Sequence, residues 1–124
     1  MNTSQENYLK AIYSLSEKSD SEFINTSSIA HKLNMKPASV TEMLKKLELK
    51  KLLEYKKYKG AKLSEKGSQA ALNIIRKHRL WEVFLLKKLH FKWDEVHEIA
   101  EQLEHIQSKE LTDRLDDFLE NPRF

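Results

Sequence analysis

Apolar residues near the start of the chain recur at intervals of three and four, which is the spacing of one helix face. Tyr8, Leu9 and Ile12 open this pattern, and Thr3 and Glu6 stand at the spacing of a capping box. We therefore predict a first helix that begins at Thr3 and fades in the polar stretch at 19–21.

A short helix, a tight connection and a longer helix follow. Asn25 and the hydroxyl residues after it are good N-caps for a helix that ends near Leu33. Pro37 suits the first turn of the next helix, where its missing N–H is not needed, and apolar spacing continues that helix to about Lys50. This order of elements is the helix-turn-helix pattern.

The period then changes from that of a helix to that of a strand. Leu53 and Tyr55 alternate with polar residues, Lys59–Gly60 is a turn signal, and the chain returns from Ala61 to Ser64. We predict a short β-hairpin with a lysine-rich tip. A basic hairpin directly after a helix-turn-helix is the wing of a winged helix.

Three more helices are expected in the rest of the chain, and Asn121–Pro122 is expected to end the last one. Their predicted caps and extents are Ser64 for a long helix over 65–89, Asp94 for one reaching about 106, and Ser108 for the last. The fold class is therefore mostly α with a small β-hairpin wing. We expect a winged helix-turn-helix domain over 1–70 and a helical domain over 71–124.

Composition excludes several classes of function. The 124 residues include no cysteine, so disulfides, thiol catalysis and cysteine-type zinc sites are ruled out. No apolar run is long enough for a membrane span, and no signal peptide is recognisable, so we expect a cytoplasmic protein without a membrane partner. Neither a nucleophile motif nor a Gly-rich phosphate loop is present, and we do not expect an enzyme.

Charge divides the chain into two unlike halves. Residues 1–67 carry 13 Lys and Arg against 8 Asp and Glu, whereas residues 68–124 carry 9 against 11. Lysines are densest in the second helix of the helix-turn-helix and in the hairpin. This distribution predicts that the first half binds nucleic acid.

The start of a recognition helix faces base edges in the major groove, while lysines and helix N-termini contact phosphates. Ser39 and Thr41 suit phosphate or bases, and Glu42 can accept from cytosine. The candidate DNA-contacting residues on these grounds are Thr26, Ser27, Lys36, Pro37, Ala38, Ser39, Thr41, Glu42, Lys45, Lys56, Lys57, Lys59 and Lys62.

Histidines and carboxylates gather in the second half. His78 and Glu82 are one helical turn apart, as are His97 and Glu101, and Glu104 lies three residues further on beside His105. Imidazole and carboxylate without sulfur suit Mn²⁺, Fe²⁺, Co²⁺, Ni²⁺ or Zn²⁺. The residues alone leave open whether these pairs bind a metal or only interact with each other and with solvent.

Two segments of this half, 78–82 (HRLWE) and 96–105 (VHEIAEQLEH), together with 6–13 and the predicted recognition helix at 40–47, resemble the diphtheria-toxin-repressor family. That family of metal-dependent transcription regulators includes iron-dependent repressors and manganese transport regulators. The resemblance covers essentially the whole chain. It implies a repressor that dimerises through the helices after the wing and binds a palindromic operator of metal-uptake genes.

The resemblance also implies two metal sites that take Mn²⁺ or Fe²⁺. The primary site would comprise Glu101, Glu104 and His105 with Asn7 from the first helix, and the ancillary site His78, Glu82 and His97. Metal in the family ties the first helix to the dimerisation helices and so sets the spacing of the two recognition helices.

The sequence departs from the family pattern in places. Glu101 resembles the manganese branch, which however has acids at the positions of Asn7 and Lys10, whereas His97 resembles the iron branch. Many members also continue into an SH3-like domain that this sequence lacks, so it represents either a short form or a truncated one.

Two other functions compete with a metal-dependent repressor. The first is a winged-helix regulator without metal control, whose His–Glu pairs only stabilise helices. The second, more remote, is a small di-metal carboxylate enzyme, which the helical Glu and His pairs suggest.

Overall fold

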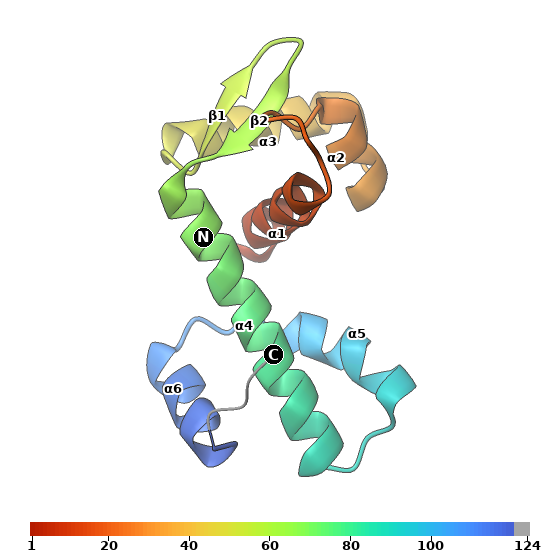
Figure 1. Ribbon diagram of the computed structural model, residues 1–124, viewed down its shortest axis with the longest axis vertical. Helices are drawn as coiled ribbons and strands as arrows, with labels where there is room; N and C mark the ends of the chain where they lie inside the picture. The colour runs from red at the N-terminus through yellow and green to blue at the C-terminus, as the bar shows by residue number, and fades with distance from the viewer. Residues whose placement is uncertain (121–124) are drawn as a thin grey trace. The chain divides into compact units, whose positions relative to one another are not determined.

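The structure is a computed structural model that describes residues 1–120, and the predicted helix stop at Asn121–Pro122 lies outside these residues. The chain divides into two compact units, 1–72 and 73–124 (Figure 1). Six helices and one hairpin follow in the order α1 Thr3–Glu17, α2 Thr26–Leu33, α3 Pro37–Leu49, β1 Leu53–Lys56, β2 Gly60–Leu63, α4 Glu65–Lys87, α5 Trp93–Leu103 and α6 Lys109–Phe118. Helix α4 begins in the first unit and continues into the second.

The first unit packs α1, α2 and α3 with the hairpin around one hydrophobic core. Val40, Leu44 and Leu47 of α3 are fully buried, at the spacing that the sequence predicts for the inner face of that helix. Leu9 of α1 and Ile29 of α2 meet them in the same cluster. The helix-turn-helix and its wing are therefore confirmed.

The first helix is capped one residue earlier than predicted. The side chain of Asn2 accepts the backbone N–H of Gln5 at 2.9 Å, and the side chain of Gln5 accepts the backbone N–H of Asn2 at 3.4 Å. Thr3 is instead the first helical residue. Asn accepts this bond as well as Thr does, and the residue spacing alone does not distinguish a capping box that starts at position 2 from one that starts at position 3.

The hairpin also turns earlier than predicted. Lys56 pairs with Gly60, so the connection is Lys57–Tyr58–Lys59 and Gly60 already belongs to β2. Gly60 has a φ of +104°, and a Cβ there would lie 1.9 Å from the carbonyl oxygen of Ile24. Glycine is required because Ile24 pairs with Ala61 as a third, one-residue strand beside β2.

The start of α4 explains a glycine that a helix would otherwise disfavour. Ser64 caps the helix as predicted, because its hydroxyl accepts the N–H of Gly67 at 3.0 Å. A Cβ at Gly67 would lie 1.9 Å from the carbonyl oxygen of Leu52. That carbonyl accepts the N–H of Ser64 at 3.0 Å, so the helix start and the loop before β1 are in direct backbone contact.

The second unit packs α5 and α6 against the later turns of α4. Leu85, Val96 and Ala100 form its buried cluster, and Arg76 of α4 pairs with Asp116 of α6 at 2.5 Å. Ser108 caps α6 as predicted. This unit therefore has a smaller apolar core than the first, within the described residues.

Three helix boundaries in the second unit differ from the prediction. Helix α4 ends at Lys87 rather than near residue 89, α5 is capped at Lys92 rather than at Asp94, and α5 ends at Leu103 rather than near residue 106. The left-handed backbone of His90, with a φ of 59°, ends the first of these helices. The carboxylate of Glu95 accepts the backbone N–H of Lys92 at 2.9 Å and so stabilises the start of the second.

Candidate metal centre and nucleic-acid interface

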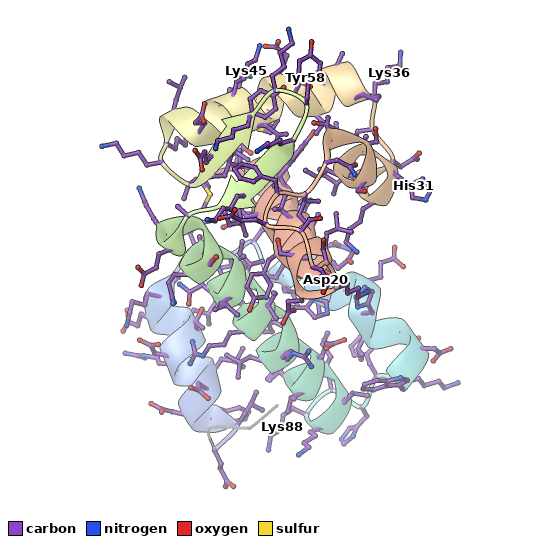
Figure 2. The ribbon with its side chains drawn as sticks, turned by 45° about the horizontal axis from the view of Figure 1, so that its top comes forward. Asp20, His31, Lys36, Lys45, Tyr58 and Lys88 are labelled. Carbon is purple, nitrogen blue, oxygen red and sulfur yellow. The ribbon has the colours of Figure 1, made fainter. Side chains whose placement is uncertain are left out.

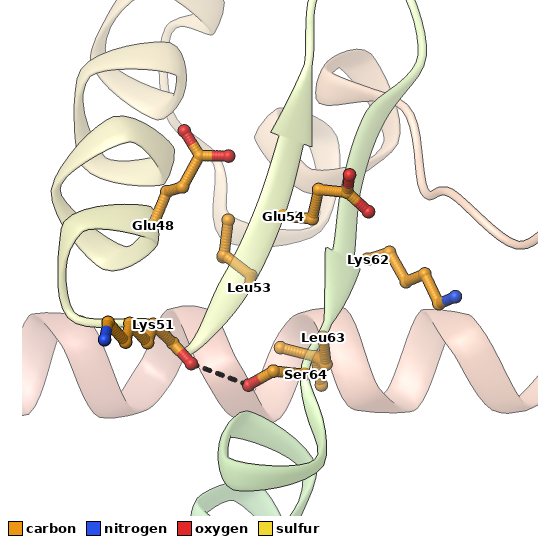
Figure 3. A pocket seen from close by; sticks show the side chains of 7 residues that line it. All are labelled: Glu48, Lys51, Leu53, Glu54, Lys62, Leu63 and Ser64. Carbon is orange, nitrogen blue, oxygen red and sulfur yellow. Dashed lines mark hydrogen bonds between the residues drawn. The ribbon is translucent and has the colours of Figure 1, made fainter.

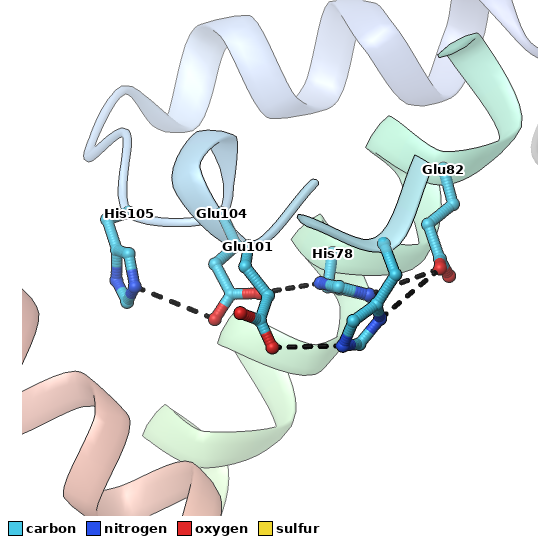
Figure 4. Close-up of polar contacts among 6 residues, drawn as sticks. His78, Glu82, Glu101, Glu104 and His105 are labelled. Atoms are coloured by element: carbon cyan, nitrogen blue, oxygen red, sulfur yellow. Dashed lines mark hydrogen bonds and ion pairs between the residues drawn. The ribbon is translucent and has the colours of Figure 1, made fainter. Parts of the chain in front are cut away.

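Two histidines and a carboxylate converge between α4 and α5 in the second unit. His78 and Glu82 lie one turn apart on α4, with Nε2 of His78 at 3.3 Å from a carboxylate oxygen of Glu82. Nδ1 of His97, from α5, lies 3.8 Å from the same oxygen of Glu82. One potential donor atom from each of the three lies within 4.8 Å of the others (Figure 4). The predicted ancillary set is thus brought together.

A fourth residue orients the most buried member of this cluster. Glu104 follows the last turn of α5 and is fully buried, and its carboxylate lies 2.6 Å from Nδ1 of His78. The side chain of His78 is only 12% exposed. A carboxylate on one ring nitrogen fixes the tautomer and turns the other nitrogen toward a metal, as outer partners of metal-bound histidines do. Glu104 therefore acts directly on the cluster.

The remaining predicted ligands extend the cluster into a row of contacts. Glu101 lies 2.9 Å from Nε2 of His97 and is half exposed, while Nε2 of His105 lies 3.7 Å from Glu104 (Figure 4). Within the second unit, the predicted primary residues therefore contact the ancillary set as well as each other. Asn7 lies on α1 in the first unit, and its assignment as a ligand stays a prediction.

The chemistry of the cluster fits a divalent transition metal. Ligand atoms bound at about 2.1 Å to one ion lie at most about 4.2 Å apart, so small side-chain rotations would close the cluster on a cation. Two imidazoles and carboxylates without sulfur are donors that Mn²⁺ and Fe²⁺ accept. His97 is 67% exposed, which leaves the cluster open on one side.

The outer face of α3 carries the predicted DNA-reading residues. Val40, Leu44 and Leu47 are buried and Met43 packs against the same core, whereas the first residues of the helix, Glu42 and Lys45 are exposed and Thr41 is partly exposed. Pro37 opens the helix after Lys36. Figure 2 shows the side chains of Lys36 and Lys45 extending from the same end of the first unit. This face has the shape and the polar groups that a recognition helix needs.

The four wing lysines differ in their partners. Lys62 forms an ion pair with Glu22, which raises the pKa of Lys62 and lowers that of Glu22 through the hydrogen bond and the opposite charge. Lys56 lies 3.8 Å from Glu54 and above the ring of Phe23. Lys57 and Lys59 are exposed residues of the connection at the hairpin tip. Among the four, Lys57 is therefore the least neutralised, because Lys59 also lies close enough to Glu22 to help lower the pKa of that carboxyl.

A shallow pocket behind the wing is structural. Acidic and basic side chains both line it, with Glu48 and Lys51 on the side of α3 and Glu54 and Lys62 on the strands (Figure 3). Glu48 accepts the backbone N–H of Tyr55 at 2.8 Å, and the hydroxyl of Ser64 donates to the carbonyl of Lys51 at 2.8 Å. These bonds join the hairpin and the start of α4 to the end of α3.

Comparison with known proteins assigns both halves of the chain. Residues 1–61 match the N-terminal DNA-binding domain of the iron dependent repressors, and residues 64–124 match their metal binding and dimerisation domain. An HTH-type transcriptional regulator of Methanocaldococcus jannaschii is 39% identical over 97% of this chain and 95% of its own length. The regulator MntR of Oceanobacillus iheyensis is 33% identical over 94% of this chain and 77% of its own length.

A solved structure agrees with these relatives. The manganese regulator SloR is 45% identical, with a TM-score of 0.79 over 95% of this chain, and this chain spans 54% of the SloR chain. These matches define the class of the protein as a metal-dependent transcriptional repressor with a winged-helix DNA-binding domain, a class of regulators rather than enzymes. The chain belongs to the iron dependent repressor family. Within residues 1–120, no helix combines the length and apolarity needed to cross a bilayer.

Sequence reasoning missed two contributors to these sites. Glu104 was predicted only as a primary-site ligand, whereas it also orients His78 across 26 residues. Glu22, which pairs with Lys62 of the wing, was not singled out at all. Neither partner stands at helical or hairpin spacing from the residue that it contacts, so no local sequence signal identifies them.

Proposed function

We propose that His78, Glu82 and His97 bind one divalent transition metal ion and that this ion raises the affinity of the chain for DNA. The observation that carries the proposal is the convergence of three donor side chains from two helices, with Glu104 fixing the ring of the most buried one. Bound metal would hold α4 and α5 together through ligands in place of the present His–Glu contacts.

Mn²⁺ and Fe²⁺ are the metals that we propose. Hard carboxylate oxygens favour Mn²⁺, and imidazole suits Fe²⁺ equally. The similarity to the manganese regulator SloR supports manganese, whereas the family as a whole is named for iron. Glu101, Glu104 and His105, with Asn7, are proposed to form a second site. Asn7→Asp tests that site, because a charged ligand in place of an amide should tighten Mn²⁺ binding measured by calorimetry.

We propose that the protein acts in the cytoplasm as a homodimer on a palindromic operator, where it represses genes for metal uptake. Two copies related by a two-fold axis would place two α3 helices in successive major grooves, so the two half-sites would carry the same sequence on opposite strands. Ser39, Thr41 and Glu42 would meet base edges, while Lys36 and Lys45 would meet phosphates.

A metal titration of DNA binding tests the proposal. The probe is a duplex selected from a random-sequence library by the wild-type chain in Mn²⁺. Binding to this duplex should increase with Mn²⁺ and with Fe²⁺ and should be lost in chelator. Glu82→Gln keeps the size of the side chain but removes the charge, and it should need a much higher Mn²⁺ concentration.

The matched control is Glu98→Gln, which removes one charge from the exposed face of α5, next to His97 in sequence. This variant should respond to Mn²⁺ as the wild type does. If wild-type binding ignores both metals and chelator, the chain is a winged-helix regulator without metal control. Equal metal responses of Glu82→Gln and Glu98→Gln would instead refute the assignment of the ligands.

A further inference from the structure

The tip of the wing presents a large aromatic ring to solvent. Tyr58 is 93% exposed, more than any other large hydrophobic side chain of residues 1–120. It lies in the middle of the three-residue connection between β1 and β2, where a small polar residue would serve a turn better. Its exposure has no explanation in the packing of the unit that carries it.

The backbone at this position also disfavours tyrosine. The φ of Tyr58 is 70°, in the left-handed region, which Asn and Gly adopt far more readily than aromatic residues do. Lys51 and His90 have the same left-handed backbone just after helix ends, whereas Tyr58 has it at an exposed hairpin tip, and strained residues cluster at functional sites. The sequence therefore keeps a ring at the wing tip although the fold alone would be better served by Asn.

Lysines surround the ring on both sides. Lys57 and Lys59 are its neighbours in the chain, and Nζ of Lys57 lies 5.3 Å from the centre of the ring. Figure 2 shows Tyr58 at the same end of the unit as Lys36 and Lys45, which flank the outer face of α3. Exposed aromatic surface between exposed lysines is complementary to nucleic acid, where sugars and bases offer apolar surface beside phosphates.

We propose that Tyr58 is a DNA-contacting residue of the wing, in addition to the lysines. Its ring packs on the deoxyribose backbone next to the groove that α3 reads, and its hydroxyl donates a hydrogen bond to a phosphate oxygen. This contact rests on the proposed function, and it is tolerant of sequence because every nucleotide has the same sugar. Lys57 and Lys59 hold the phosphates on either side of the ring.

The variant that tests this contact is Tyr58→Asn, because Asn suits the left-handed backbone and removes the ring. Binding to the selected duplex in Mn²⁺ should weaken by about 5-fold, the lower end of what stacking of a base on an aromatic ring contributes, because a sugar offers less contact area than a base. The thermal midpoint of the protein should stay at or above that of wild type, since the strain is relieved. Tyr58→Phe should retain most of the affinity.

The salt dependence of DNA binding distinguishes a contact made by the ring from contacts made by the lysines around it. A neutral side chain releases no counterions, so the slope of log K against log salt should be the same for Tyr58→Asn and wild type. Lys57→Ala should make that slope shallower by about 0.9. Hydroxyl-radical footprints should show sugars that wild type protects and Tyr58→Asn exposes, outside the bases that α3 covers.

Two results overturn different statements. If Tyr58→Asn binds and protects the duplex as wild type does while Lys57→Ala weakens binding, Tyr58 makes no contact and the inference is wrong. If the wild-type chain selects no duplex in Mn²⁺, the proposed function itself fails. A lower thermal midpoint for Tyr58→Asn would show that the ring stabilises the wing, which also contradicts the inference.

Discussion

Each of the two units is stabilised internally by a different kind of interaction. The DNA-binding unit buries a continuous apolar cluster to which all three of its complete helices and both strands contribute. The metal-binding unit buries a smaller apolar cluster around Leu85, Val96 and Ala100, and the same pair of helices is joined by His78 and His97 with their carboxylate partners. Apolar contacts need no ligand, whereas a His–Glu cluster is stabilised by any cation that it binds. Metal should therefore stabilise the second unit directly and leave the core of the first unchanged.

The largest expected effect on stability comes from a cavity in the core of the DNA-binding unit. Leu44 of α3 is fully buried, so Leu44→Ala should lower the free energy of unfolding by roughly 2–5 kcal/mol. The loss combines the lost burial with the cavity that remains. Urea unfolding followed by far-UV circular dichroism measures it.

A comparison of Leu44→Ala with and without Mn²⁺ tests whether the first unit is independent of metal. Hydrogen exchange of the α3 amides should accelerate in Leu44→Ala to the same degree with Mn²⁺ and with chelator, because the cavity is a property of the apolar core. Protection of α3 that Mn²⁺ restores in the variant would contradict the difference drawn between the two units.

Metal binding should produce the next largest effect, in the second unit. Both tryptophans of the chain, Trp81 and Trp93, lie in this unit, so their emission follows its unfolding. Mn²⁺ at about 100 times its dissociation constant should stabilise the native state by about 2.7 kcal/mol. Thermal unfolding in Mn²⁺ and in chelator, followed by tryptophan emission, measures this difference.

The control for this experiment is again the pair of charge variants. Glu98→Gln should show the full metal-induced shift, while Glu82→Gln should show little of it, because Glu82 approaches both histidines of the cluster. A full shift in Glu82→Gln would place the metal elsewhere in the chain.

The same difference decides what the sequence could predict. In the first unit, the helix-turn-helix and the wing follow from periodicity, caps and turn residues, because the apolar residues of each helix and strand lie on one buried face. Errors there are local, such as Asn2 in place of Thr3 as the cap. In the second unit, the i, i+4 pairs were predictable, but the contact between His78 and Glu104 depends on how α5 packs on α4, which periodicity does not specify.

Gly67 shows the same limit within the first unit. Helix propensity predicts that Gly67→Ala stabilises the protein by about 1 kcal/mol. The structure predicts the opposite sign, a loss of about 1–3 kcal/mol, because the added Cβ would overlap the carbonyl oxygen of Leu52. Urea unfolding decides between them. Gln69→Ala, at an exposed position of the same helix, should change stability by less than about 0.5 kcal/mol.

The smallest effect concerns the charge of the wing. The side chains of Lys62 and Glu22 are 43% and 66% exposed, so Glu22→Gln should hardly change stability near neutral pH. The lowered pKa of Glu22 makes its contribution present above its ordinary value of 4.5 and lost as the pH falls through the folded value. The raised pKa of Lys62 makes its contribution present below 10.5 and lost as the pH rises through the folded value. Any stability effect of the pair is therefore constant between about pH 5 and pH 10.

DNA binding should respond to Glu22→Gln more clearly than stability does. The substitution releases Lys62 to meet phosphate, so affinity for the selected duplex should rise by about 2- to 5-fold. The salt slope should steepen by about 0.9 because one more counterion is released. Glu17→Gln removes the same charge from the exposed end of α1 and should leave the slope unchanged. Equal changes in both variants would mean that only net charge matters and that Glu22 does not restrain Lys62. An unequal result would show that the wing, like the His–Glu cluster, is tuned by a partner distant in the sequence.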